Sequence, residues 1–187
     1  MRVAVFDYGA GNLHSLTKAL AGPGVDVAIE ADPFALLLAD AIVLPGVGAF
    51  GAAAARLAPA RQPVAAALAA GMPCLGICLG MQLLFDTSDE SPAAQGLGVI
   101  AGRVTRLRAA RVPHMGWNTV TSSLNVAYFA HSYVCRPDDE SVVTAWTVED
   151  GDRFPSAVRW RNVVGVQFHP EKSSAAGVRF LREVLSL

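Results

Sequence analysis

Short apolar runs that end in glycine-containing turns recur along the first half of this chain, and segments with helical character follow them. The runs at 3–6, Ala41–Leu44 and Cys74–Ile77 are too short for helices but suit strands that are buried on both faces. Leucines recur at helical spacing through residues 13–20, and residues 63–70 are rich in Ala and Leu before a glycine. This alternation predicts an α/β fold, an open and mostly parallel sheet flanked by helices.

The second half of the chain has a different pattern, in which strand-like runs follow one another with turn residues between them. We expect additional, partly antiparallel strands at residues 99–107, 126–129, 142–146 and 163–168. Residues 81–85 suit a helix, and the apolar positions of 178–185 fall on one face of a final helix. A chain of 187 residues without an internal repeat or a linker predicts a single domain over residues 1–187.

The charge balance excludes several classes of function. The formal net charge is −1 at pH 7 and no block of like charges occurs, so we expect no nucleic-acid partner. Arg56, Pro59, Arg61 and Pro63 interrupt the longest Ala-rich stretch, so we expect no membrane span. Three cysteines do not suggest a disulfide framework, and we therefore expect a reduced, cytoplasmic protein.

Cys78 is the predicted catalytic nucleophile. It lies in Gly-Ile-Cys-Leu-Gly at 76–80, which has the form of a nucleophile elbow with Cys in place of Ser. The flanking glycines leave room for a tight turn from strand to helix. A helix that begins just after Cys78 favours the reactive thiolate, and the N–H of Leu79 is placed to stabilise an oxyanion. The simpler explanation, a small buried side chain, is the one we accept for Cys74 and Cys135.

His169 is the predicted base. It follows an apolar strand and opens the sequence His-Pro-Glu, in which Pro170 disfavours a helix. Residues i and i+2 of an extended backbone point the same way, so the carboxylate of Glu171 can orient the imidazole. His114 has no acidic neighbour and is interpreted as structural or interfacial, whereas His131 can line a pocket.

Neither a metal nor a cofactor is predicted. Cys74 and Cys78 lack further ligands nearby for a structural zinc site. The glycine-rich turn at 9–14 has His14 where a dinucleotide-binding loop has its third glycine, so the match does not support a nucleotide cofactor.

Several motifs together resemble those of the class I, triad-type glutamine amidotransferases. These motifs are Pro-Gly-Val-Gly at 45–48, Gly-Ile-Cys-Leu-Gly-Met-Gln at 76–82 and Phe-His-Pro-Glu at 168–171. Three further segments are similar to the glutaminase subunits of imidazole glycerol phosphate synthases, which act in histidine biosynthesis; they lie at 7–13, 113–118 and 169–174. The resemblance covers essentially the whole chain and implies a flavodoxin-like fold.

The resemblance also implies a reaction and its residues. Cys78 would attack the side-chain amide of glutamine and form a thioester, with His169 moving protons and Glu171 orienting it. The oxyanion hole would consist of the N–H of Leu79 and a backbone N–H of the 45–48 loop, that of Val47. The glutamine contacts that the family implies are Gly46, Gly48, Gln82, Glu90, His131, Ser132 and Tyr133.

A partner follows from the same resemblance. The subfamily implies a heterodimer with a (β/α)₈-barrel cyclase, which receives the ammonia through a closed passage and makes imidazole glycerol phosphate. The candidate interface residues are Asn12, Ser15, Lys18, Trp117 and Lys172. The stretch 121–126 looks shorter than the family pattern, so the strand before His131 is expected to begin differently.

Two alternatives stay open at this point. The first is another enzyme on a similar sheet, either a general cysteine hydrolase or a glutaminase that serves a different synthase. The second is a non-catalytic regulatory module that keeps the fold. The pairing of His169 with Glu171 and the 45–48 loop favour a glutaminase over a peptidase, and the intact triad argues against a module that has lost its activity.

Overall fold

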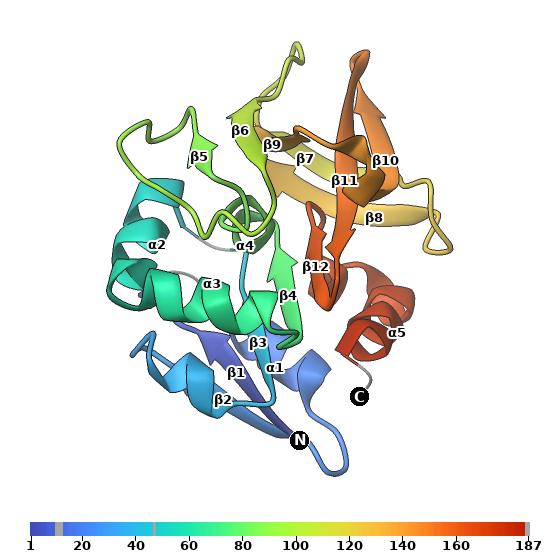
Figure 1. Ribbon diagram of the computed structural model, residues 1–187. Helices are drawn as coiled ribbons and strands as arrows, with labels where there is room; N and C mark the ends of the chain where they lie inside the picture. Colours follow the sequence, from blue (N-terminus) through green and yellow to red (C-terminus); the bar gives the residue numbers. More distant parts are fainter. Residues whose placement is uncertain (10–12, 47, 186–187) are drawn as a thin grey trace.

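A seven-stranded sheet forms the centre of the protein in this computed structural model, which describes residues 1–9, 13–46 and 48–185 (Figure 1). The strand order is β10 (Val143–Glu149), β11 (Asp152–Trp160), β12 (Val163–Val166), β4 (Cys74–Ile77), β3 (Ala41–Leu44), β1 (Arg2–Phe6) and β2 (Asp26–Glu30). The five strands from β12 to β2 are parallel, and β11 and β10 extend the sheet with antiparallel pairing. The predicted α/β fold with a mostly parallel sheet is therefore confirmed.

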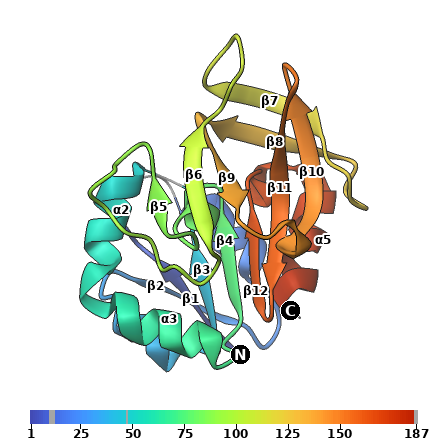
Figure 2. The same ribbon diagram turned by 45° about the horizontal axis from the view of Figure 1, so that its top comes forward.

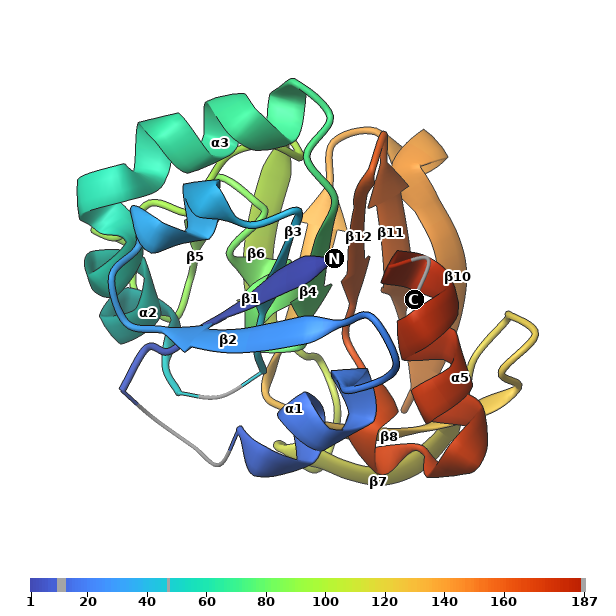
Figure 3. The same ribbon diagram turned by 90° about the horizontal axis from the view of Figure 1, so that it is seen from below.

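Helices cover both faces of this sheet (Figure 3). One face packs against α1 (His14–Leu20) and α5 (Ser174–Leu185), and the other against α2 (Phe50–Leu57) and α3 (Arg61–Ala69). Side chains of β1 alternate between the two cores, with Val3 and Val5 on the α1 and α5 side and Ala4 and Phe6 on the other. Burial on both faces explains why the sequence shows continuous apolar runs here.

Two smaller sheets lie beyond the carboxyl ends of the central parallel strands (Figure 2). β5 (Thr87–Ser88), β6 (Gly102–Arg106) and β9 (Tyr133–Pro137) form one of them, and β7 (His114–Thr119) pairs with β8 (Val126–His131) in the other. The short stretch 121–126 falls at the turn of the β7–β8 hairpin, at the opposite end from the pair His114 and His131. The expectation that the strand before His131 begins differently from the family pattern stays a prediction.

Single turns complete the described elements. The 3₁₀ turns are η1 (Ala35–Leu38), η2 (Ala58–Ala60), η3 (Glu140–Val142) and η4 (Pro170–Lys172), and α4 (Leu79–Gln82) is one helical turn. The helix expected at 81–85 was therefore misplaced. The N–H groups of Leu84 and Phe85 reach back three residues instead of four, so the chain tightens and leaves the helix after Gln82.

Some strands begin or end at residues other than those predicted, and some helices and strands had no prediction. The strand expected at 99–107 begins only at Gly102, and β8 extends to His131. No strand was predicted at β11, whose charged residues and Pro155 hide its pattern, and no helix at the Ala-rich α2. Among the described residues, no helix is long and apolar enough to cross a membrane.

Candidate active site

Cys78 occupies a sharp turn between β4 and α4. Its φ is 49° and its ψ is −103°, a conformation that residues other than glycine rarely adopt. The backbone N–H of Cys78 donates to the carbonyl of Val166, the last residue of β12, at 2.7 Å, which continues the pairing with β12 one residue beyond the end of β4. Backbone strain of this kind costs on the order of 1–3 kcal/mol and persists where the surrounding structure fixes it. The strand pairing therefore holds the thiol in its projecting position.

Three glycines make this turn possible. A Cβ on Gly76 would lie 2.6 Å from the carbonyl oxygen of Gly80, and a Cβ on Gly80 would overlap the carbonyl of Leu44. A Cβ on Gly46 would lie 2.8 Å from both the Cβ of Cys78 and the Cε1 of His169. Gly46 therefore fills the space where the predicted nucleophile and base approach each other, and no other residue fits there without displacing them.

His169 and Glu171 lie together beside Cys78, as the sequence predicted. The Nδ1 of His169 and the Oε1 of Glu171 are 2.8 Å apart, and both side chains are more than nine-tenths buried. Burial alone would lower the pKa of His169, but hydrogen bonding to Cys78 and Glu171 raises it to about 9. The imidazole is thus held between a sulfur and a carboxylate, which is the order of a nucleophile, a base and its orienting group.

Ser173 holds the backbone of His169 in place. The Oγ of Ser173 donates to the carbonyl of His169 at 2.7 Å and accepts the N–H of Tyr128 at 2.9 Å. The N–H of His169 donates to the carbonyl of Tyr128 at 2.8 Å. Sequence reasoning assigned no role to Ser173, because these contacts depend on β8, which is distant in the chain.

Gln167 is a second polar residue that sequence reasoning missed. Its side chain is fully buried, and its Nε2 lies 3.5 Å from the Sγ of Cys78. Its Oε1 accepts from the Nε2 of Gln82 at 3.5 Å. The available signal was a polar residue within the apolar run 163–168. The side-chain amide of Gln167 is therefore a buried hydrogen-bond donor to the sulfur of Cys78.

A cavity of about 280 Å³ opens beside the sulfur. It is lined by Gly46, Gly48, Cys78, Leu79, Gln82, Glu90, Pro113, Ala130, His131 and Ser132. The structure thus brings together most of the residues that the resemblance implied for glutamine. Val47, predicted for the oxyanion hole, lies outside the described residues. Tyr133 does not line the cavity, but its carbonyl accepts a hydrogen bond from the Nε2 of Gln82 at 3.1 Å.

Glu90 connects this cavity to α2. Its Oε2 accepts the N–H of Phe50, the first residue of α2, at 2.8 Å. A carboxylate at the start of a helix stabilises the unpaired N–H groups there. Glu90 therefore joins the cavity wall to the helix that follows the 45–48 loop.

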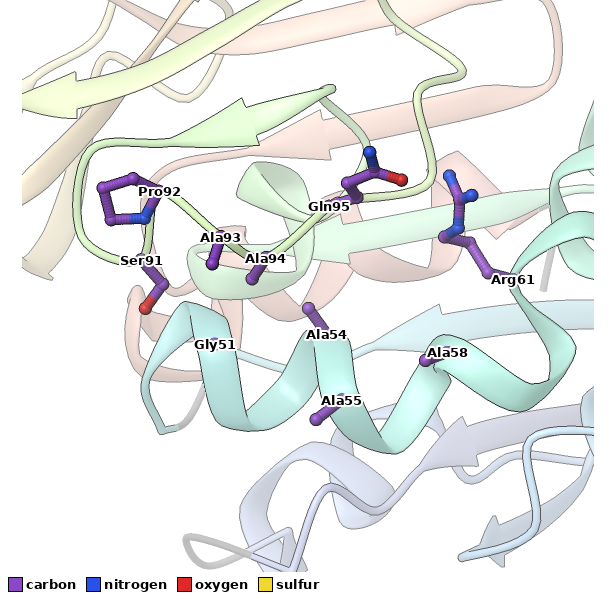
Figure 4. A pocket seen from close by; sticks show the side chains of 10 residues that line it. All are labelled: Gly51, Ala54, Ala55, Ala58, Arg61, Ser91, Pro92, Ala93, Ala94 and Gln95. Atoms are coloured by element: carbon purple, nitrogen blue, oxygen red, sulfur yellow. The ribbon is translucent and has the colours of Figure 1, made fainter.

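A larger cavity, of about 610 Å³, lies between α2 and the segment 91–95 (Figure 4). Small side chains such as Ala54, Ala55 and Ala58 line it, and Arg61 is the charged residue of its wall. Its lining includes the hydroxyl of Ser91 but no cysteine, histidine or carboxylate that could serve with it as nucleophile or base. The smaller cavity beside Cys78 is therefore the candidate active site.

The helix α1, which carries Ser15 and Lys18, and the strand β7, which carries Trp117, lie on one side of the molecule (Figure 3). Trp117, on β7, is 56% exposed, and its ring centre lies 6.2 Å from that of Tyr128. The Nζ of Lys172 lies 6.0 Å from the same Tyr128 ring. Met115, two residues before Trp117 on β7, is 65% exposed and was missed in the sequence. Trp117, the half-buried Tyr128 and Lys172 thus form one cluster at the surface.

The other predicted interface residues are Ser15, Lys18 and Asn12. Ser15 and Lys18 are exposed on α1, and Asn12 lies outside the described residues. Among residues 1–9, 13–46 and 48–185, no group of three or more His, Cys, Asp or Glu side chains could hold a metal ion.

Comparisons with known proteins agree with the geometry. The family model "Glutamine amidotransferase class-I" matches residues 4–185. A crystal structure of a glutamine amidotransferase superposes with a TM-score of 0.79 at 20% identity, covering 99% of both chains. The structure of PurLQS from Thermotoga maritima gives 0.75 at 19% identity, covering 99% of this chain and 97% of that one. The chain therefore belongs to the class-I glutamine amidotransferase family, as its motifs predicted.

Curated relatives define the subfamily. The imidazole glycerol phosphate synthase subunit HisH of Pyrococcus furiosus is 44% identical over 97% of this chain and 96% of that protein. The subunit HisH of Halobacterium salinarum is 46% identical, over 96% of this chain and 90% of that protein. Within its family, the chain belongs with the HisH subunits of imidazole glycerol phosphate synthase.

Proposed function

We propose that this chain hydrolyses the side-chain amide of glutamine with Cys78 as nucleophile, His169 as proton shuttle and Glu171 as the group that orients it. The observation that carries the proposal is the 2.8 Å contact between His169 and Glu171, with the same imidazole beside Cys78, since a Cβ on Gly46 would lie 2.8 Å from both the Cβ of Cys78 and the Cε1 of His169. A raised pKa at His169 favours a thiolate paired with an imidazolium, which is the reactive form of a cysteine nucleophile.

The first half of the reaction forms a thioester. The thiolate of Cys78 attacks the carboxamide carbon, and the carbonyl oxygen becomes an oxyanion. The backbone N–H groups of Leu79 and Val47 stabilise that charge in this proposal. The imidazolium of His169 gives its proton to the leaving nitrogen, so ammonia departs as the C–N bond breaks.

The second half returns the enzyme to its starting state. The neutral imidazole of His169 takes a proton from a water molecule, and the resulting hydroxide attacks the thioester carbon. The C–S bond then breaks, glutamate is released, and the proton on His169 pairs again with the thiolate of Cys78. Glu171 stabilises the imidazolium in both halves without giving up its own charge.

The cavity beside Cys78 holds the substrate in this proposal. Gln82 and Glu90 are the side chains that face its amino-acid end, together with the backbone of 131–133. Gly46 and Gly48 also line the cavity. A carboxylate such as Glu90 suits the α-ammonium group of an amino acid, because opposite charges attract strongly in a partly buried site.

We further propose that the ammonia passes to a (β/α)₈-barrel cyclase that makes imidazole glycerol phosphate in histidine biosynthesis. The support is the family membership, because the relatives carry the name of a synthase subunit. The surface cluster of Trp117, Tyr128 and Lys172, with Ser15, Lys18 and Asn12, is the proposed docking side. Exposed aromatic residues are common at the centre of protein interfaces.

The test is ammonia release from glutamine, measured for the full chain alone and with the cyclase bound to its own ligand. We expect slow hydrolysis alone and faster hydrolysis in the complex. Equal rates would contradict the proposed partner. A control with peptide substrates separates a glutaminase from a general cysteine hydrolase, and no hydrolysis of either substrate would favour a regulatory module.

A further inference from the structure

Two buried histidines outside the proposed triad form a pair behind the glutamine cavity. His114 on β7 and His131 on β8 lie opposite each other in the hairpin register, and the Nδ1 of His114 is 3.1 Å from the Nε2 of His131. They are 6% and 5% exposed and pack against Phe129 and Phe154. A buried polar pair of this kind must satisfy its own hydrogen bonds.

The chemistry of the partners fixes where the protons lie. The Nδ1 of His131 is 3.0 Å from the carbonyl oxygen of Tyr133, which can only accept, so this nitrogen carries a proton. Burial, with the neighbouring His114 and His169, lowers the pKa of His131 to about 3, so the ring is neutral and its Nε2 is an acceptor. The Nδ1 of His114 therefore carries a proton and donates it to His131.

The outer end of the pair accommodates both charge states of His114. Its Nε2 lies 3.3 Å from the Nδ2 of Asn118 and 3.4 Å from the Oε2 of Glu149. When neutral, the ring accepts from Asn118; when protonated, it donates to Glu149. Burial lowers the pKa of His114, whereas the charges of Glu149 and of Asp150, in the turn after β10, act to raise it. In either state the proton on Nδ1 remains, so the direction of the hydrogen bond to His131 does not change.

The other end of the histidine pair, at His131, reaches the substrate cavity. The carbonyl of Tyr133 accepts from both His131 and Gln82, whose side chain lines the cavity. The neighbouring carbonyl of Ser132 accepts the N–H of Leu107 at 2.9 Å. His131 and Ser132 themselves line the cavity. Two donors on one carbonyl restrict the peptide of Tyr133 and the amide of Gln82 together.

We propose that His114, acting through His131, is a positioning residue for the glutamine site. It holds the proton of His131 on Nδ1, and that proton fixes the carbonyl of Tyr133 and the side chain of Gln82 against the substrate. Glu149 and Asn118 anchor the outer end of this chain of hydrogen bonds. The inference rests on the proposed function, because it assigns these residues to the binding of glutamine.

A matched pair of variants tests the proposal. Asn and Leu have nearly the same shape, but His114→Asn keeps an N–H close to the position of Nδ1, whereas His114→Leu removes it. We expect His114→Leu to raise the KM for glutamine about fivefold to tenfold, the effect of losing one buried hydrogen bond, with kcat within about twofold. His114→Asn should keep KM within about twofold. Equal KM values in the two variants, or a parallel loss of kcat in both, would overturn the proposal.

A second measurement reads the hydrogen-bond chain without any reaction. The ¹⁵N shifts of the imidazole nitrogens in the ligand-free full chain report which nitrogen of His131 carries the proton. We expect a neutral ring protonated on Nδ1 that does not titrate between pH 5 and 8. A proton on Nε2 would overturn the proposal. If the unaltered protein does not hydrolyse glutamine, the proposed function is contradicted. The ¹⁵N shifts test only the positioning role of His114, so the failure of one proposal is distinguished from the failure of the other.

Discussion

The two ends of β4 carry two buried cysteines with opposite properties. Cys74 opens the strand and Cys78 follows its last residue, and they are only 1% and 6% exposed. Burial raises the pKa of Cys74 to about 12, so it stays a thiol within the core between the sheet and α2 and α3. Cys78 instead has Gln167 and His169 beside its sulfur. Exposure therefore does not distinguish the proposed nucleophile from the packed thiol, whereas the neighbouring polar groups do.

The topology of the sheet explains this difference. β3, β4 and β12 are adjacent and parallel, so the turns that follow them meet at one edge. Gly46, Cys78 and His169 come from these three turns. The opposite edge carries the amino ends of the same strands, and Cys74 lies there among apolar side chains. Open parallel sheets place their ligands at the carboxyl edge for this reason.

The largest expected effect separates the two cysteines directly. Cys78→Ala should lower glutamine hydrolysis by about 10³-fold or more, because the thioester cannot form. Cys74→Ala should keep the rate within about twofold. Steady-state ammonia release checks both. A Cys78→Ala protein that keeps full activity would refute the assignment of the nucleophile.

The second largest expected effect is a fall in kcat when a methyl group is added at Gly46, at the carboxyl edge of the sheet. Gly46→Ala places a methyl group between Cys78 and His169, and a displacement of about 1 Å there should lower kcat by about 10²-fold. Gly22→Ala is the matched control, since a Cβ at that position meets no atom within 4 Å. If both variants keep full activity, the close approach of Cys78 and His169 is not needed for the reaction.

The pH dependence should show the raised pKa of His169. We expect kcat to fall about tenfold per pH unit above about 9, where the imidazolium loses its proton. Glu171→Gln should move this limb to lower pH, because Glu171 is one cause of the shift. The measurement is kcat as a function of pH for both proteins. If kcat falls at the same pH in both, the role of Glu171 is contradicted.

The same pKa predicts a change in stability. His169 has a higher pKa in the folded state than the value of about 6.5 for an unfolded chain, so its stabilisation is complete below about pH 6.5 and is lost as pH rises through about 9. Thermal unfolding should therefore show a larger fall in Tm over this range for the unaltered protein than for His169→Asn. Equal falls would show that His169 gains no such stabilisation.

The smallest effect belongs to the packed cysteine. Cys74→Ala removes one buried sulfur from the core and should lower the free energy of unfolding by about 1 kcal/mol, with a fall in Tm of a few degrees. Calorimetry checks the Tm, and the hydrolysis assay checks that activity is kept. Lost activity in a folded Cys74→Ala protein would contradict the contrast between the two ends of β4.

Local patterns predicted the central parallel strands and the residues Cys78, His169 and Glu171 that the structure brings together, whereas residues that depend on long-range contacts were missed. The Cys78 turn and the His169–Glu171 pair depend on spacing within a few residues, so the sequence was enough to find them. Gln167 contacts Cys78, which follows β4, and Ser173 contacts Tyr128 of β8; no local pattern places these segments beside them. β11 was missed because its neighbours β10 and β12 stabilise it in spite of its charged residues and Pro155.

Covalent capture of Cys78 tests the central claim most directly. A diazoketone analogue of glutamine, 6-diazo-5-oxo-L-norleucine, is incubated with the full chain, with and without excess glutamine. Both cysteines fall in one tryptic peptide, residues 62–103, so fragment ions must assign the added mass. We predict one label, on Cys78, that excess glutamine prevents. A label on Cys74, or no label on a folded protein that still hydrolyses glutamine, would contradict the claim that Cys78 is the nucleophile.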